Sequence, residues 1–155
     1  MSEVKVHRPR YRLADKLRRG DQITAGRALA QARSRVESLR AATLEAVDHE
    51  LALLETAAVS HDPEARTEGI LAAADRIAGL VGALEKMQDM AGVAFGLCTL
   101  VEKMSQSAQW DGNAVEVHVA ALRILRGGVG QMEAQVLLAG LQKVRAHFKG
   151  QPQGG

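Results

Sequence analysis

The sequence of 155 residues is poor in aromatic residues, prolines and cysteines. Only 3% of it is aromatic, and it contains three prolines and one cysteine. The single cysteine, Cys98, excludes an internal disulfide and any cysteine-cluster zinc or iron–sulfur site, and we interpret it as a small core residue. No segment alternates apolar and polar residues as a half-buried strand does, so the sequence predicts helices and no strands.

Long apolar stretches are also lacking. The longest run without a charged residue, Met90–Val101, contains two glycines and is far shorter than a membrane span. Residues 1–20 are charged and have no apolar stretch, so we expect no signal peptide. Hydrophobic residues make up 46% of the chain, an ordinary share for a globular protein. We therefore expect a soluble, cytoplasmic protein with one domain.

Charge is distributed unevenly along the chain. Residues 1–40 hold 11 Lys and Arg against 4 Asp and Glu, a net charge of +7, whereas residues 41–105 hold 4 against 11, a net charge of −7. The positive charge is densest in residues 1–20, which we interpret as a flexible basic arm. The candidate partner-binding residues of this arm are Arg8, Arg10, Arg12, Lys16, Arg18 and Arg19.

A basic arm of this kind has several candidate ligands. It can bind phosphates, an acidic membrane surface or an acidic protein, or lie against the acidic middle of this chain or of a neighbour. Recognition of nucleic acid usually also needs aromatic platforms or a recognition helix, and Tyr11 is the only aromatic residue in the arm. We therefore expect a protein partner, and binding to nucleic acid or a membrane surface through the arm is the alternative.

A long helix is predicted after Gly20. Asp21 or Thr24 can cap it, and it runs to about Val59. Its apolar residues are spaced by three and four, and a shift of phase between two groups resembles a coiled-coil stutter. The first group is Leu29, Ala32, Val36 and Leu39, and the second is Leu44, Val47, Leu51, Leu54 and Ala58.

A tight break follows at residues 60–63. Pro63 suits the first position of the next helix, with Asp62 or Ser60 as its cap. Residues 63–107 then form either one long helix or two helices with a kink, and they pair with the first helix as an antiparallel hairpin. Their apolar residues keep one helical phase, which predicts that they share one face: Ile70, Ala74, Ile77, Val81, Leu84, Ala91, Phe95 and Cys98.

Two further breaks lie at residues 110–112 and 127–130. Between them, Asn113 and Glu116 have the spacing of a capping box, which predicts a helix over about 114–126. A last helix is indicated by apolar residues spaced by four, three and four: Leu137, Leu141, Val144 and Phe148.

The predicted fold is an all-α bundle of four to five helices, built on the long antiparallel hairpin. The bundle occupies residues 21–149 and is followed by a disordered tail at residues 150–155. The long helices exceed what residues 113–148 can cover, which favours a homodimer through the hairpin.

Histidine chemistry is the first candidate activity. The five histidines do not have the spacing of metal ligands, so we expect no metal site and no cofactor. His118 shares a helix face with Val115 and Leu122, and a histidine on a helical bundle suggests a phosphotransfer domain. That family normally has a Lys and a Gly shortly after its histidine, and here residues 119–122 are Val, Ala, Ala and Leu. The other interpretation of His118 is a packed core residue.

The segment Met87–Val93 suggests a second activity. It resembles the helix of the chemotaxis phosphatase CheZ, in which a Gln-Asp pair is followed by a Gly and then by a Gln that positions the attacking water. Gln88, Asp89 and Gly92 fit this pattern, but Val93 stands where the water-positioning amide is needed. The alternative is a polar step beside a core stripe.

Most of the chain, over roughly residues 10–126, is similar to a family of small helical proteins encoded with bacterial chemotaxis genes and labelled CheE. The segments that carry this resemblance are Arg12–Ala14, Leu44–Asp48, the helix around Ala72–Leu80, and Val115–Arg123. The resemblance implies an accessory role in chemotaxis signalling, and it supplies no catalytic residue.

We therefore expect a non-enzymatic accessory protein that modulates a bacterial two-component pathway by binding a kinase, receptor or response regulator. A partner helix or receiver domain would dock on the hairpin, and the basic arm would steer the encounter. The alternatives are phosphotransfer through His118, receiver-phosphatase activity through Asp89 and Gln88, and binding of nucleic acid or a membrane surface through the arm.

Overall fold

The structure is a computed structural model that describes residues 12–148, with side chains from residue 25 onward. This part of the chain is all-α, as predicted, and contains no strand. Residues 1–11 of the predicted arm and the predicted tail at 150–155 lie outside the described residues. The elements are α1 (Arg12–Ala58), α2 (Pro63–Gly82), the 3-10 turn η1 (Glu85–Met87), α3 (Gln88–Ser107), α4 (Gly112–Gly127) and α5 (Gln131–His147).

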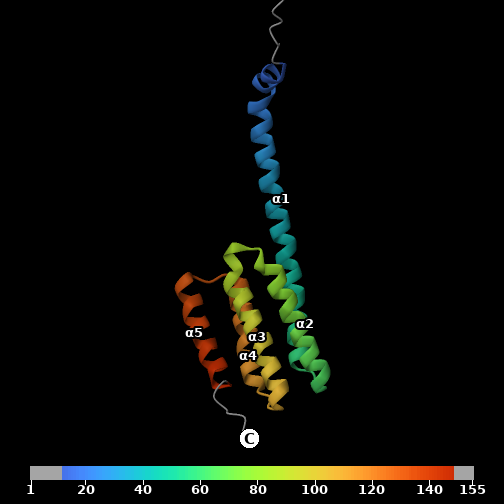
Figure 1. The fold of residues 1–155 in the computed structure, drawn as a ribbon, viewed down its shortest axis with the longest axis vertical. Coiled ribbons are helices and arrows are strands. Elements are labelled where there is room, and N and C mark those ends of the chain that lie inside the picture. The colour runs from blue at the N-terminus through green and yellow to red at the C-terminus, as the bar shows by residue number, and fades with distance from the viewer. Residues whose placement is uncertain (1–11, 149–155) are drawn as a thin grey trace, which may run out of the picture. The chain divides into compact units, whose positions relative to one another are not determined.

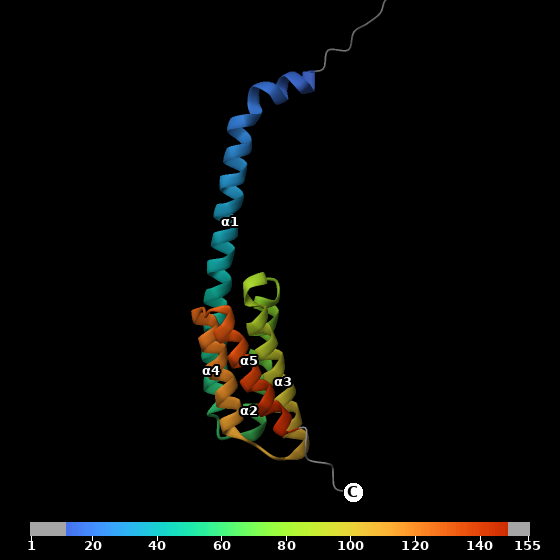
Figure 2. The same ribbon diagram turned by 90° about the vertical axis from the view of Figure 1, so that its left-hand side faces the viewer.

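The chain divides after Ala41 into two compact units. The described part of the first unit is a single helical segment, residues 12–41 of α1. In the second unit, the end of α1 and helices α2 to α5 run alternately in opposite directions and form an up-down bundle (Figures 1 and 2). α3 contacts α2, α4 and α5, so it is the central helix of the bundle.

The start of the long helix differs from the prediction. The sequence predicts a start after Gly20, but α1 begins at Arg12 and continues through that glycine. A glycine inside a helix costs only about 1 kcal/mol relative to alanine, and the Leu, Ala, Lys and Arg residues of positions 12–19 favour helix. The predicted caps Asp21 and Thr24 therefore lie inside the helix, and residues 12–20 of the predicted arm are helical.

Residues 63–107 form two helices separated by η1. The predicted stripe of α2 is confirmed, since Ile70, Ala74, Ile77 and Val81 are buried. In α3 the same phase is confirmed at Ala91, which is buried, and wrong at Phe95, which is exposed while Leu97 is buried instead. The break between α2 and α3 resets the helical phase, so the face that α3 buries does not follow from that of α2.

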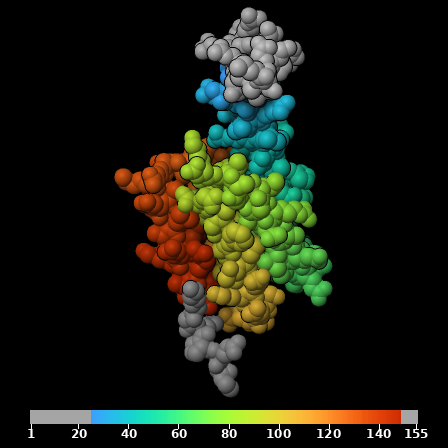
Figure 3. Space-filling model, turned by 45° about the horizontal axis from the view of Figure 1, so that its top comes forward, coloured from blue at the N-terminus to red at the C-terminus, as the bar shows by residue number. Residues whose placement is uncertain are grey.

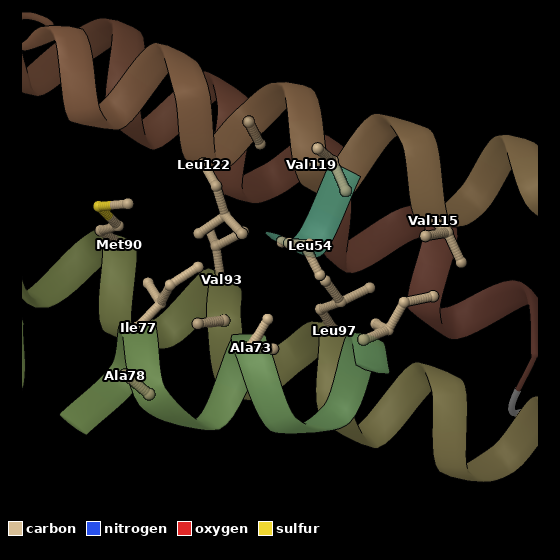
Figure 4. Packing of buried hydrophobic residues seen from close by; sticks show 14 of the residues in the cluster. Leu54, Ala73, Ile77, Ala78, Met90, Val93, Leu97, Val115, Val119 and Leu122 are labelled. Atoms are coloured by element: carbon tan, nitrogen blue, oxygen red, sulfur yellow. The ribbon is translucent and has the colours of Figure 1, made fainter. Parts of the chain in front are cut away.

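The core lies between the end of α1 and helices α2, α3 and α4. Side chains from all four helices meet in it, and Leu54, Ile77, Leu97 and Leu122 point toward one another (Figure 4). All four are fully buried. α5 covers this core with Leu141, and its other predicted apolar residues, Leu137, Val144 and Phe148, pack against it half-buried.

Three ion pairs join the end of α1 to its neighbours. Glu50, which is itself buried, lies 3.4 Å from the Arg76 guanidinium on α2. On α4, Arg126 donates to Asp48 at 2.6 Å, and Arg123 donates to both carboxylate oxygens of Glu55 at 2.6 and 2.8 Å. The Arg123 guanidinium holds the pKa of the Glu55 carboxyl below its ordinary value. The end of α1 is therefore joined by ion pairs to both α2 and α4.

The helix caps agree with the prediction at α2 and differ at α4. Asp62 Oδ1 accepts hydrogen bonds from the Glu64 and Ala65 amides at the start of α2, as predicted. The predicted capping box at Asn113 is wrong, because α4 already begins at Gly112 and Asp111 Oδ1 accepts from the Ala114 amide at 3.1 Å. Because Asp111 already accepts from the Ala114 amide at the start of α4, Asn113 is not needed as a cap.

The residue that ends α3 suggests a stabilising substitution. Ala108 has a φ of 51°, in the left-handed region that glycine adopts without steric cost. We expect Ala108→Gly to raise the free energy of unfolding by about 0.5–1 kcal/mol in urea titrations. Ala83 ends α2 with an ordinary φ of −84°, so Ala83→Gly is the matched control and should lower it. Equal effects of the two substitutions would contradict this account.

Candidate functional site

The most unusual surface lies on the exposed segment, which we define as residues 25–41 of α1. Every side chain in it is exposed, including its large apolar ones: Leu29 is 55% exposed, Val36 61% and Leu39 68%. These residues and Ala32 are spaced by three and four, so they share one face of the helix and form an apolar stripe. The stripe has the spacing that the sequence predicts, but it does not enter the core.

Positive charge surrounds the apolar stripe. The exposed segment holds four arginines and one acidic residue, Glu37, and all five side chains are exposed. The arginines are Arg27, Arg33, Arg35 and Arg40. An apolar stripe with basic neighbours on one helix is complementary to an amphipathic helix with acidic neighbours.

The arm residues predicted from the sequence fall outside this description. Arg8 and Arg10 lie beyond the described residues, and Arg12, Lys16, Arg18 and Arg19 lie in the part of α1 whose side chains the structure does not describe. The arginines of the exposed segment carry the same charge and directly follow that part along the chain. Sequence reasoning did not single them out, although the count of charges over residues 1–40 includes them.

A second surface is an apolar groove at the junction of α2 with the end of α3. It has a volume of about 870 Å³, and its apolar lining includes Leu71, Met104 and Trp110. The guanidinium of Arg66 stacks over the indole of Trp110 at 4.0 Å from the ring centre. Trp110 is the only tryptophan of the chain, so intrinsic tryptophan fluorescence reports on this groove.

His118 lies in the core rather than on the surface. Its side chain is 0% exposed, and Nδ1 lies 2.8 Å from the Ala114 carbonyl oxygen, to which it donates when protonated. Nε2 is buried with no hydrogen-bond partner. Burial lowers the pKa of the imidazole, the hydrogen bond to Ala114 opposes this, and the charge of Arg145 adds to the lowering. A buried, neutral histidine lacks the access to a second protein that phosphotransfer needs.

The CheZ-like segment is divided between solvent and core. Gln88 and Asp89 are exposed in the first turn of α3, and Gln88 Nε2 donates to the Gly82 carbonyl oxygen at 2.8 Å. Val93, which stands at the position of the water-positioning glutamine, is buried in the core (Figure 4). Since Val93 points into the core, that position cannot present a side chain to a phosphoryl group on a partner.

Cys98 is half-buried and packs against the core, in keeping with its predicted role. Burial raises the pKa of its thiol, and the nearby carboxylates of Asp75 and Glu102 raise it further, so the thiol is not an activated nucleophile.

Over residues 25–148, no group of three or more His, Cys, Asp or Glu side chains could hold a metal ion. In the same part of the chain, no helix combines the length and the apolar character that a membrane crossing requires.

Comparison with known proteins adds no relative. No protein-family model, no curated protein and no solved structure matches the chain.

Proposed function

We propose that this protein is a non-enzymatic interaction protein that binds a partner along the exposed segment of α1. The observation that carries the proposal is the apolar stripe, with Leu29 and Val36 more than half exposed on a continuous helix. Helices in proteins gain most of their stability by packing an apolar face against something. An exposed apolar stripe on an ordered helix is therefore typical of a surface that another chain covers.

The chemistry of the segment supports one kind of partner. The four arginines beside the stripe favour a helix that has its own apolar stripe and flanking Asp or Glu side chains. A second copy of this segment would bring its arginines against arginines, so charge disfavours a symmetric pairing of the segment with itself. The occupant that we propose is an acidic amphipathic helix of a different protein.

The resemblance to CheE-like proteins supports a place for this partner in bacterial chemotaxis. We propose that the acidic helix belongs to a kinase, receptor or response regulator of such a pathway, and that this protein modulates signalling by occupying it. The basic charge of residues 1–40 would speed the encounter.

The test measures the affinity of the full chain for purified chemotaxis kinase, receptor signalling domain and response regulator by calorimetry. We expect one of them to bind and Val36→Asp to weaken that binding at least tenfold, which corresponds to about 1.4 kcal/mol. The substitution places a charge in the apolar stripe at an exposed position, so the fold should persist. Binding should also weaken as salt is raised.

Ser34→Asp is the matched control. Ser34 is exposed on the same helix two residues from Val36, a spacing that puts it on another face, so this variant should bind like wild type. Equal losses in the two variants would refute docking on the stripe. A change in Trp110 fluorescence on binding would instead place the partner in the apolar groove. Binding of RNA or acidic vesicles, abolished by deletion of residues 1–20, would replace the proposal with the arm-based alternative.

A further inference from the structure

A basic pocket lies between α3 and α5, on the opposite side of α3 from α2. Figure 3 shows α5 lying directly against α3 on this face. The pocket has a volume of about 380 Å³ and is lined by Thr99, Leu100 and Lys103 of α3 and by Gln142, Arg145 and Ala146 of α5. No sequence signal pointed to it, because its residues come from two helices that are far apart along the chain.

The lining of the basic pocket has two cations and no carboxylate. Lys103 and Arg145 are both half-buried, and neither takes part in any of the ion pairs found among residues 25–148. The Gln142 amide is a further donor, and the Thr99 hydroxyl donates to the Phe95 carbonyl oxygen, so toward a ligand it can act as an acceptor. Two neighbouring cations without a counter-charge repel each other, and an anion between them removes that repulsion.

The Arg145 side chain lies against a glycine of α3. A Cβ atom placed on Gly96 would lie 2.5 Å from Arg145 Nη1 and 3.1 Å from Cζ. Gly96 itself is buried in α3. The guanidinium therefore lies against the α3 backbone in a space that any other residue at position 96 would fill. This close approach places the guanidinium next to the α3 side chains of the pocket.

We propose that the basic pocket binds a phosphate-class oxyanion, either free phosphate or the phosphate of a small monoester. Arg145 offers a planar donor fork that matches two phosphate oxygens, Lys103 supplies a second positive charge, and the Gln142 amide can donate a third hydrogen bond. This site is separate from the exposed segment of α1, so it does not depend on the proposed partner binding.

The position of the pocket near His118 provides an independent readout. Burial lowers the pKa of His118 and the positive charge of Arg145 contributes to the lowering. An oxyanion bound to Arg145 cancels much of that charge. The pKa of His118 should therefore rise when the pocket is filled, although His118 itself does not line the pocket.

The experiment titrates the full chain with inorganic phosphate and, separately, with glycerol phosphate, by calorimetry at constant ionic strength. We expect saturable binding of one site per chain. Arg145→Gln and Lys103→Gln should each weaken it at least tenfold. Lys143→Gln is the matched control, because Lys143 is exposed on α5 and does not line the pocket, so this variant should change affinity less than twofold.

Tighter binding of glycerol phosphate than of phosphate would identify a monoester as the ligand, and the reverse would identify free phosphate. The His118 signals in a pH titration by NMR should move to a higher pKa when phosphate is present, which checks the site without any substitution. The proposal is overturned if neither anion saturates, if Lys143→Gln weakens binding as much as Arg145→Gln, or if the pKa of His118 is unmoved at saturating phosphate.

Discussion

Replacement of Leu54 by alanine should lower the free energy of unfolding by about 3 kcal/mol. Leu54 comes from the end of α1, is fully buried, and packs against side chains of α2, α3 and α4 in the core (Figure 4). Truncation of a buried leucine removes its transfer free energy and leaves a cavity that neighbouring side chains fill only in part, at a cost of about 2–5 kcal/mol. The substitution thus measures how strongly the end of α1 contributes to the bundle.

The preceding residue supplies the control. Leu53 is 41% exposed on the same turn of α1, so Leu53→Ala should cost less than about 1 kcal/mol. Both variants lose the same atoms at adjacent positions and differ in burial. Urea unfolding followed by far-ultraviolet circular dichroism gives both values, and similar losses in the two variants would show that α1 is not packed as described.

The second large effect is a loss of stability in acid through His118. Burial lowers the pKa of His118 in the folded protein. As the pH falls through about 6.5, the unfolded chain therefore binds a proton at this residue, while in the folded chain the imidazole stays neutral to a lower pH. The stability that depends on a neutral His118 is complete above that pH and declines below it. The slope for one proton approaches about 1.4 kcal/mol per pH unit.

His118→Leu separates this effect from general acid unfolding. It replaces the imidazole with an apolar side chain of similar size, and so removes the buried Nε2 that has no hydrogen-bond partner. At pH 7 we expect the variant to be as stable as wild type or more so, since an unsatisfied buried polar atom is costly. Unfolding titrations between pH 7.5 and 5 should show a shallower loss in the variant, and parallel curves would exclude His118 as the titrating group.

The sequence was most informative where local rules decide the structure. The stripe of α2, the Asp62–Pro63 start of that helix and the break at residues 127–130 follow from periodicity, capping and glycine content, and the structure confirms them. Errors occurred where two local signals compete, as at Gly20, or where a break resets the helical phase, as before Phe95.

Close approaches between helices could not be predicted. Of the glycines at positions 79, 82, 92 and 96, only Gly96 has a neighbour at its Cβ position, the Arg145 side chain. A second close approach is at Gly69, where a Cβ would lie 2.8 Å from that of Ala57 on α1. Such contacts depend on which helices become neighbours, and periodicity within one helix does not contain that information.

The candidate surfaces had the same limitation. The apolar stripe of the exposed segment was visible in the sequence, but its exposure was not, because an a/d-like spacing looks the same whether a helix packs within its own chain or against another. Lys103 and Arg145 become neighbours only once α5 lies on α3.

The ion pairs of α1 have a consequence for register. Many of the core side chains of the bundle are Leu, Val, Ile or Ala, and a helix that slid by one turn along its neighbours would exchange one aliphatic contact for another. Asp48, Glu50 and Glu55 each meet a single arginine on a neighbouring helix. A slide by one turn, 5.4 Å, would separate all three pairs at once. The carboxylates of α1 thus add to the preference of the core for one alignment of this helix along its neighbours.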